Sequence, residues 1–336
     1  MVNRVRLLSL CLVLGATAFS PILTIEAPRD LGTLGGESSV AHAVNAWGTV
    51  VGQSRDLDEN EHAFLWRNGN MIDLGTLRPG EPAQSEAYDI NALGQVVGRS
   101  DAYSEESGLN VRAFLWEAGA MRDLGTLGGT WSTAFAINNR SEIVGVSELA
   151  TGGPSHAFLY RQGVMSDLGG LNAEAASVAY AINPSGAVAG ACEDRPGGYY
   201  RACLWANGTV TDLGTFGGPS SEALGINRWG TVVGASQTPD GEWRAFLWRN
   251  GAITDLGTLG GSRSWAFGIN DLGQVVGYST NSAGGDEAFL WERGAMTALP
   301  GLGGPCTAEA VNNLGAIAGS CALLELGTSH ASLWTR

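Results

Sequence analysis

Residues 41–76 read AHAVNAWGTVVGQSRDLDENEHAFLWRNGNMIDLGT, and this stretch predicts four short strands joined by turns. We expect strands at 41–45, 49–54, 63–66 and 71–74, because these segments are rich in the branched and aromatic residues that fit a pleated sheet. Asn45 begins a reverse turn that ends at Gly48, since Asn accepts hydrogen bonds from the following backbone and Gly tolerates a positive φ. Consecutive hairpins make the unit a four-stranded antiparallel meander.

The same unit recurs along the chain. Asp-Leu-Gly, or a degenerate copy at Ala298, returns every 43 to 50 residues, and an Asn follows each copy. A fixed period in this range marks a repeat architecture. The recurring positions are Asp30, Asp73, Asp123, Asp167, Asp212 and Asp255, with Asn45, Asn91, Asn138, Asn183, Asn227, Asn270 and Asn312.

Seven such units predict an all-β protein, a seven-bladed β-propeller of four-stranded antiparallel blades, because radial stacking buries both faces of each sheet. A β-solenoid is the alternative, but its coils are usually shorter and lack repeated tight hairpins. The last unit stops at Arg336 without a fourth strand, whereas Thr24 to Leu31 form an orphan copy of that strand. We therefore expect the N-terminal strand to close the ring, with one blade built from residues 24–31 and the C-terminal unit. The repeats leave no room for the second domain that a length of 336 residues would allow.

The first eighteen residues have the pattern of a secretory signal peptide. Arg4 and Arg6 precede an apolar run from Leu7 to Leu14, and small residues follow at 16–18. The run is too short for a membrane-spanning helix, which needs about 20 apolar residues. We predict a signal peptide at 1–18 and a propeller at 19–336, secreted to the exterior or the periplasm and without a membrane span after cleavage.

Composition removes several classes of chemistry. All 19 basic residues are Arg, so lysine Schiff bases, the phosphate-loop lysine and Ser-Lys dyads are excluded. A net charge of −14 disfavours nucleic acid and anionic lipid, which are bound mainly by clustered cations. We expect no nucleic-acid partner.

The units resemble the HAF repeat family of probable extracellular repeat proteins, which takes its label from the His-Ala-Phe found here at His62 and His156. The resemblance covers residues 30 to 334 through Asn-x-x-Gly, Val-Val-Gly, Ala-Phe-Leu-Trp and Asp-Leu-Gly-Thr-Leu-Gly-Gly. Departures are local, such as Cys203 in place of Phe and Tyr160 in place of Trp. The resemblance implies a secreted or surface protein and transfers no activity to any residue.

Catalytic and metal-binding patterns are mostly missing from the sequence. None of the Gly-x-Ser segments continues to the Gly of a nucleophile elbow, and His-Glu-x-x-His does not occur. The recurrent Asp residues are interpreted as structural acceptors for the backbone of the following turn. Asp56, Asp58 and Asn60 offer oxygen ligands for Ca²⁺ but lack the Gly and distal Glu of an EF-hand loop. We assign no catalytic residue, no metal and no cofactor.

Ligand binding is expected on the face that carries the variable loops between the second and third strands and the crossings between blades. Aromatic rings stack on sugar C–H surfaces and carboxylates accept hydroxyl hydrogens, so this face favours an extracellular glycan or protein ligand. A hydrolase or lyase using an acid such as Glu106 or Asp194, and a structural envelope protein, are the alternatives. The candidate residues are Tyr103, Tyr199, Tyr200 and Trp243 in loops, and Trp131 and Trp265 in crossings.

Four cysteines remain after the signal peptide, an even number that suggests pairing in an exported protein. The turn near Asn313 places Cys306 opposite Cys321. Cys192 and Cys203 flank a hairpin and can also lie opposite each other. We predict the disulfides Cys192–Cys203 and Cys306–Cys321, because pairing between distant blades would exceed the Cα separation that a disulfide tolerates.

Overall fold

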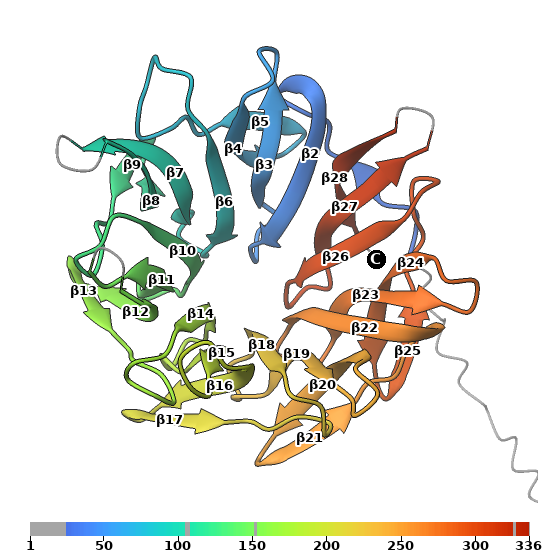
Figure 1. The fold of residues 1–336 in the computed structure, drawn as a ribbon. Helices are drawn as coiled ribbons and strands as arrows, with labels where there is room; N and C mark the ends of the chain where they lie inside the picture. The colour runs from blue at the N-terminus through green and yellow to red at the C-terminus, as the bar shows by residue number, and fades with distance from the viewer. Residues whose placement is uncertain (1–24, 105–107, 151–152, 325–326, 336) are drawn as a thin grey trace, which may run out of the picture.

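Seven antiparallel sheets of four strands each form a ring in the computed structural model of the chain (Figure 1). The structure describes residues 25–104, 108–150, 153–324 and 327–335. The expected signal peptide, Thr24 and Glu106 lie outside the described residues. The described residues contain β-strands and no helix. The predicted seven-bladed β-propeller is confirmed.

The blades follow one another in chain order, and the first strand of each blade lies nearest the centre of the ring (Figure 1). Blade 1 contains β2 (Gly35–Val44), β3 (Val50–Asp56), β4 (Glu61–Arg67) and β5 (Asn70–Asp73). Blade 2 contains β6 (Ser85–Ile90), β7 (Val96–Ser104), β8 (Gly108–Glu117) and β9 (Ala120–Asp123). Blade 3 contains β10 (Ser132–Ile137), β11 (Ile143–Glu148), β12 (Ser155–Arg161) and β13 (Val164–Asp167). Blade 4 contains β14 (Ser177–Ile182), β15 (Val188–Glu193), β16 (Tyr200–Ala206) and β17 (Thr209–Asp212).

The remaining three blades complete the ring. Blade 5 contains β18 (Ser221–Ile226), β19 (Val232–Gln237), β20 (Trp243–Arg249) and β21 (Ala252–Asp255). Blade 6 contains β22 (Gly260–Ile269), β23 (Val275–Asn281), β24 (Asp286–Glu292) and β25 (Ala295–Ala298). Blade 7 contains β26 (Cys306–Val311), β27 (Ile317–Leu323), β28 (Thr328–Trp334) and the N-terminal strand β1 (Arg29–Asp30).

Each first strand carries a β-bulge at the same repeat position. In blade 1, Ala41 pairs with Gly52 and Ala43 with Val51, so His42 is the extra residue. The same register shift recurs in the other six blades. A bulge re-aims the side chain that it carries. Seven residues of the innermost strands are thereby set apart from the regular alternation.

Packing between consecutive blades explains the Ala-Phe-Leu-Trp pattern of the third strands. Val51 and Leu65 of blade 1, for example, belong to one buried cluster with Val96 and Phe114 of blade 2. The Phe of this pattern is fully buried wherever it occurs, because it fills the space against the preceding blade. Removing apolar surface from water in these seven interfaces is the main source of stability.

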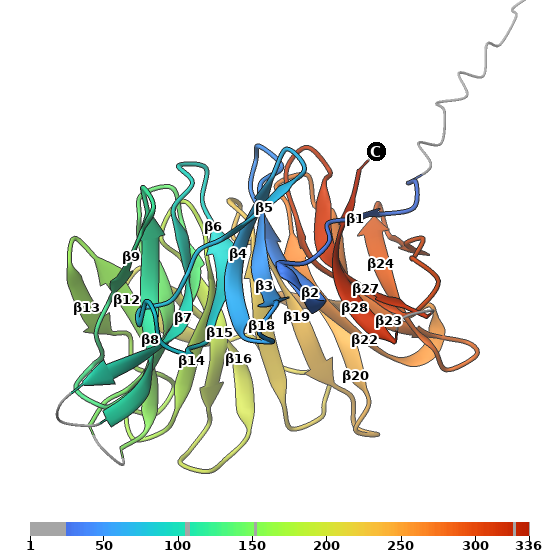
Figure 2. The ribbon, with the colours of Figure 1, turned by 90° about the horizontal axis from the view of Figure 1, so that it is seen from above.

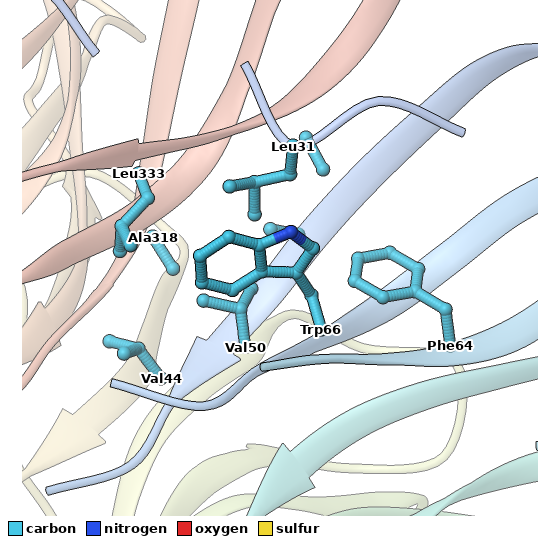
Figure 3. Close-up of a cluster of buried hydrophobic side chains, with 9 residues drawn as sticks. Leu31, Val44, Val50, Phe64, Trp66, Ala318 and Leu333 are labelled. Carbon is cyan, nitrogen blue, oxygen red and sulfur yellow. The ribbon is translucent and has the colours of Figure 1, made fainter. Parts of the chain in front are cut away.

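The N-terminal strand closes the ring as predicted, but it is limited to Arg29–Asp30 and does not extend over all of the expected residues 24–31 that the structure describes. Arg29 and Asp30 of β1 pair antiparallel with Leu333 and Ser332 of β28, so the last blade has its fourth strand. Next to this pairing, Leu31 and Leu333 pack beside Trp66 of blade 1 (Figure 3). The two chain ends are thus joined by strand pairing and by a buried cluster.

A second closure runs through the seven repeated asparagines, all of which are buried. Each Oδ1 accepts backbone N–H groups of its own turn, as Asn45 does from Trp47 at 2.9 Å and Thr49 at 3.1 Å. Each Nδ2 also donates to the backbone carbonyl of the Asn in the next blade, at 2.9 to 3.3 Å. The last of these bonds runs from Asn312 to Asn45, so the hydrogen-bonded ring is complete.

Both predicted disulfides are present. Cys306 and Cys321 lie directly opposite each other on β26 and β27, as expected. The expectation that Cys192 also lies opposite Cys203 is wrong, since Cys203 pairs with Gly190 and Cys192 with Arg201. This bond crosses the ladder diagonally with a Cα separation of 6.1 Å, which a disulfide tolerates.

Candidate functional site

The ring has two different faces. We call the side with the loops between second and third strands and the crossings between blades the loop face, and the side with the tight hairpin turns the turn face. Seen edge-on in Figure 2, hairpins of unequal length such as β7–β8 project from the loop face.

The repeated Asp residues of this face are engaged in backbone hydrogen bonds. Oδ1 of each of the six accepts the N–H of the Gly two residues later at 2.7 or 2.8 Å. Three of them also contact the His of the third strand, as in His62 Nδ1 to Asp73 Oδ2 at 2.8 Å. The hydrogen bond to Asp73 raises the pKa of His62, although burial opposes it. This geometry supports a structural role for the Asp residues.

Two of the predicted ligand residues lie in contact at the boundary of blades 5 and 6. Trp243 stacks on Trp265 with ring centroids 5.7 Å apart, and Trp265 stacks on Tyr278 at 5.1 Å. Phe267 extends the row toward the centre at 5.8 Å from Tyr278. Both Trp placements need correction: Trp265 lies inside β22 and not in a crossing, and Trp243 is the first residue of β20 and not a loop residue. The strands extend further toward the loop face than local composition indicates.

The other four candidates lie in blades 2, 3 and 4. Tyr199 lies in a loop of blade 4 and is exposed, and Trp131 lies in the crossing just before β10. Tyr103, although exposed, is part of β7 and not of a loop, and Tyr200 begins β16. Among the six, Trp243 and Trp265 are the two that the structure brings into ring contact from different blades.

A pocket of about 290 Å³ lies between blades 6 and 7, next to this aromatic row. Tyr278 forms part of its wall and is backed on one face by Trp265. Asp286 contributes a partly exposed carboxylate, which Arg263 Nη2 approaches at 3.4 Å. Hydroxyl groups of Thr307, Ser320 and Ser329 complete the polar part of the lining. Cys306 of the blade 7 disulfide also lines the pocket, so one wall is covalently braced.

The bulged residues form a second group around the axis of the ring. His42, Tyr88, Phe135 and Tyr180 of blades 1 to 4 contact one another in sequence, with ring centroids 5.1 to 5.4 Å apart. Leu224, Phe267 and Glu309 hold the same position in blades 5 to 7. Burial raises the pKa of Glu309, which opposes its ionisation. The inner ring is therefore aromatic over more than half of its circumference.

A charged cluster adjoins this ring between blades 1 and 2. Glu86 receives hydrogen bonds from Arg99 Nε at 2.9 Å and the Tyr88 hydroxyl at 2.6 Å, and His42 Nε2 lies 3.0 Å away. Burial alone would raise the pKa of Glu86, but these partners lower it to about 2. The carboxylate is thus ionised and fully engaged. Glu86 and Arg99 line a smaller pocket of about 80 Å³ with Gln53.

The catalytic and metal candidates are placed as follows. Within the described ranges, no group of three or more His, Cys, Asp or Glu side chains is arranged to hold a metal ion. Asp56 Oδ1 accepts the N–H groups of Asp58 and Asn60, so this oxygen holds its own turn. The serines of Gly-x-Ser bond to crossings, as in Leu34 N–H to Ser54 Oγ at 2.9 Å. Asp194 similarly accepts the Tyr199 N–H.

In the described part of the chain no helix is long and apolar enough to cross a membrane.

Sequence reasoning missed Tyr278 and the inner ring. Tyr278 is the one aromatic residue at a repeat position that otherwise holds Gln53, Arg99, Val146, Ala191, Ala235 and Ser320. The inner-ring position likewise varies from His to Tyr, Phe, Leu and Glu between a constant Ala and a constant Asn. In both places, variation at one position of an otherwise uniform repeat was the available signal.

No family model matches the chain, and no curated protein matches it. Among solved structures, a puromycin-hydrolyzing peptidase of Mycobacterium tuberculosis aligns over 88% of this chain and 51% of its own, with 12% identity and a TM-score of 0.56. A puromycin hydrolase variant aligns over 82% and 46%, with 13% identity and a TM-score of 0.55. An Aleuria aurantia lectin aligns over 82% and 99%, with 12% identity and a TM-score of 0.40. The chain thus spans about half the length of the two hydrolases, and its likeness to them shows the propeller fold.

Proposed function

We propose that the protein is a secreted, non-catalytic propeller that binds an extracellular glycan in the pocket between blades 6 and 7. The observation that carries this proposal is the Tyr278 ring, which forms the pocket wall with Trp265 stacked behind it. A rigid aromatic face suits the C–H surface of a pyranose, because stacking then costs little side-chain entropy.

The polar groups of the pocket favour a neutral sugar. The Asp286 carboxylate accepts hydroxyl hydrogens, and the hydroxyls of Thr307, Ser320 and Ser329 both donate and accept. The net charge of −14 disfavours a polyanionic chain. A volume of about 290 Å³ is at the lower end of the range for small-molecule sites, which suits one sugar residue of a longer glycan.

We also propose membership of the HAF repeat family and export from the cell. The two disulfides support export, since such bonds persist in oxidising compartments. The repeat motifs quoted above support the family assignment.

A glycan array followed by calorimetric titration tests the binding proposal. With a neutral glycan that binds, we expect Tyr278→Ala and Asp286→Asn each to weaken affinity at least about tenfold, and Tyr278→Phe to retain it because stacking needs only the ring. Gln53→Ala is the matched control, since Gln53 has the same repeat position in blade 1.

Two results would overturn the proposal. One is the absence of saturable binding to any glycan, and the other is binding that Tyr278→Ala leaves unchanged. Cleavage of the bound glycan into shorter products would replace the non-catalytic role with a hydrolase or lyase.

A further inference from the structure

The turn face carries an arc of exposed apolar side chains. Each turn between first and second strands presents the residue two places after its repeated Asn, and five consecutive blades, from blade 5 through blade 7 to blade 2, have Trp or Leu there. Single exposed apolar residues are ordinary, but a contiguous row of them marks an interaction surface. The exposed fractions are 70% for Trp229, 72% for Leu272, 79% for Leu314, 77% for Trp47 and 67% for Leu93. We call these five residues the apolar arc.

The turns hold the apolar arc at one height. Each turn has the same two backbone hydrogen bonds to its Asn Oδ1, and the asparagine ring joins each turn to the next. Because equivalent residues of a closed ring of like blades are related by rotation about its axis, the five tips lie near one plane. A flat arc fits a flat surface.

The indole N–H groups of the two Trp residues in the apolar arc are paired within the protein. Trp47 Nε1 donates to the Ala92 carbonyl and Trp229 Nε1 to the Asp271 carbonyl, both at 3.1 Å. Each indole therefore lies across the neighbouring turn with its N–H satisfied. The main penalty for placing a polar group in an apolar phase is the loss of its hydrogen-bond partner. The two indole N–H groups would avoid this penalty, because their partners belong to the protein.

Arginines flank the apolar arc on the same face. Arg67 and Arg249 end β4 and β20, and Arg293 lies in the turn after β24, so all three are at the outer turns of blades 1, 5 and 6, and all three are exposed. None of the three has an ion pair within the described residues. The six repeated Asp residues are on the loop face. The turn face also has carboxylates, but Asp271 and Glu142 pair with Arg228 and Arg140, and Glu117 and Glu292 accept hydrogen bonds from Gln95 and Gln274. The expectation that the protein repels anionic lipid holds only for an even distribution of charge.

We propose that the turn face docks on an anionic phospholipid bilayer, with the apolar arc entering the interface and Arg67, Arg249 and Arg293 contacting phosphates. Trp and Leu are suited to the boundary between headgroups and acyl chains, and nearby Arg side chains add attraction to anionic lipid. This mode leaves the blade 6–7 pocket directed away from the membrane.

A second copy of the chain fits the arc less well than a bilayer. Face-to-face pairing of two turn faces would bring the same unpaired arginines together. Stacking on the loop face of another copy would set a flat arc against hairpins of unequal length (Figure 2). The bilayer has neither disadvantage, because its surface is flat and carries the opposite charge.

Vesicle co-sedimentation tests the proposal, using exported protein whose N-terminus is confirmed by mass spectrometry. The vesicles contain phosphatidylcholine alone or with one quarter phosphatidylglycerol. We expect binding to the mixed vesicles, weakened by salt, and an at least about tenfold loss for the pair Trp229→Ser and Leu272→Ser. Arg249→Glu with Arg293→Glu should remove the preference for phosphatidylglycerol.

The matched control is Leu57→Ser on the loop face, where Leu57 is 82% exposed. It should bind vesicles like the wild type, and unchanged melting temperatures show that all variants fold. The proposal is refuted if wild-type protein does not sediment with mixed vesicles, or if the arc pair binds them unchanged. A loss of dimer mass in the arc variants, without any vesicle binding by wild type, would make a second copy the occupant.

Discussion

Replacing Asn312 with Ala tests the hydrogen-bonded closure of the ring. The change removes the bond from Nδ2 to the Asn45 carbonyl at 2.9 Å and the bonds that Oδ1 accepts from Leu314 and Ala316 at 2.9 and 3.0 Å. A buried hydrogen bond contributes about 1 kcal/mol net, so the loss should be about 3 kcal/mol. The Asn45 carbonyl keeps the hydrogen bond that it accepts from the Gly48 N–H at 3.1 Å, so it adds little to this cost.

Urea denaturation followed by far-ultraviolet circular dichroism measures the change in unfolding free energy. Asn313→Ala is the control: its side chain makes two exposed bonds to Asp271, at 2.8 and 2.7 Å, so it should cost less than about 1 kcal/mol. Equal midpoints for the two variants would refute the role assigned to the asparagine ring.

Three further predictions concern the chain ends, an inner acid and a disulfide. Deleting residues 19–31 should expose the edge of β28 and cause aggregation or a lower melting temperature in light scattering and calorimetry; an unchanged monomer would contradict closure by strand pairing. Burial raises the pKa of Asp89 to about 6. The folded state therefore binds this proton more tightly than the unfolded chain does, so the contribution of Asp89 to the unfolding free energy is largest below about pH 4 and is lost as the pH rises through 6. Asp89→Asn should therefore make the unfolding free energy depend less on pH between about pH 4 and 6. The same pH dependence as in the wild type would contradict the raised pKa. Replacing Cys306 and Cys321 together by Ser should cost about 3 kcal/mol, since the bond closes a loop of 15 residues. Peptide mapping without reductant should recover only the two pairings seen, and free thiols at these positions would contradict them.

The repeat was readable from sequence because its determinants are local. The Asx turn at Asn45 involves only residues up to Thr49, and the same turn is encoded seven times. The orphan strand before Leu31 and the truncated last unit likewise revealed the closure without any knowledge of packing. Cys306 and Cys321 could be paired because a short turn sets the register of the hairpin between them.

The residues whose positions were predicted wrongly are those whose location depends on how far a strand extends or where it bulges. Trp243 and Trp265 lie inside strands because the ladders of blades 5 and 6 continue past the composition boundaries. The loop between Cys192 and Cys203 sets their diagonal offset, and loop residues alone do not specify it. A bulge such as that at His42 shifts the alternation by one residue, so the inner ring could not be assigned from periodicity.

The sequence by itself determined the seven blades, their four strands and the closure, because these depend on turns and hydrophobic patterns that repeat along the chain. Only the tertiary structure decided which side chains meet: Tyr278 with Trp265, the Asn of one blade with the carbonyl of the next, and the apolar arc with the unpaired arginines. Each of these contacts or groupings joins residues in different strands or blades. Their proximity depends on the radius and register of the closed ring, which are set by how all seven interfaces pack together.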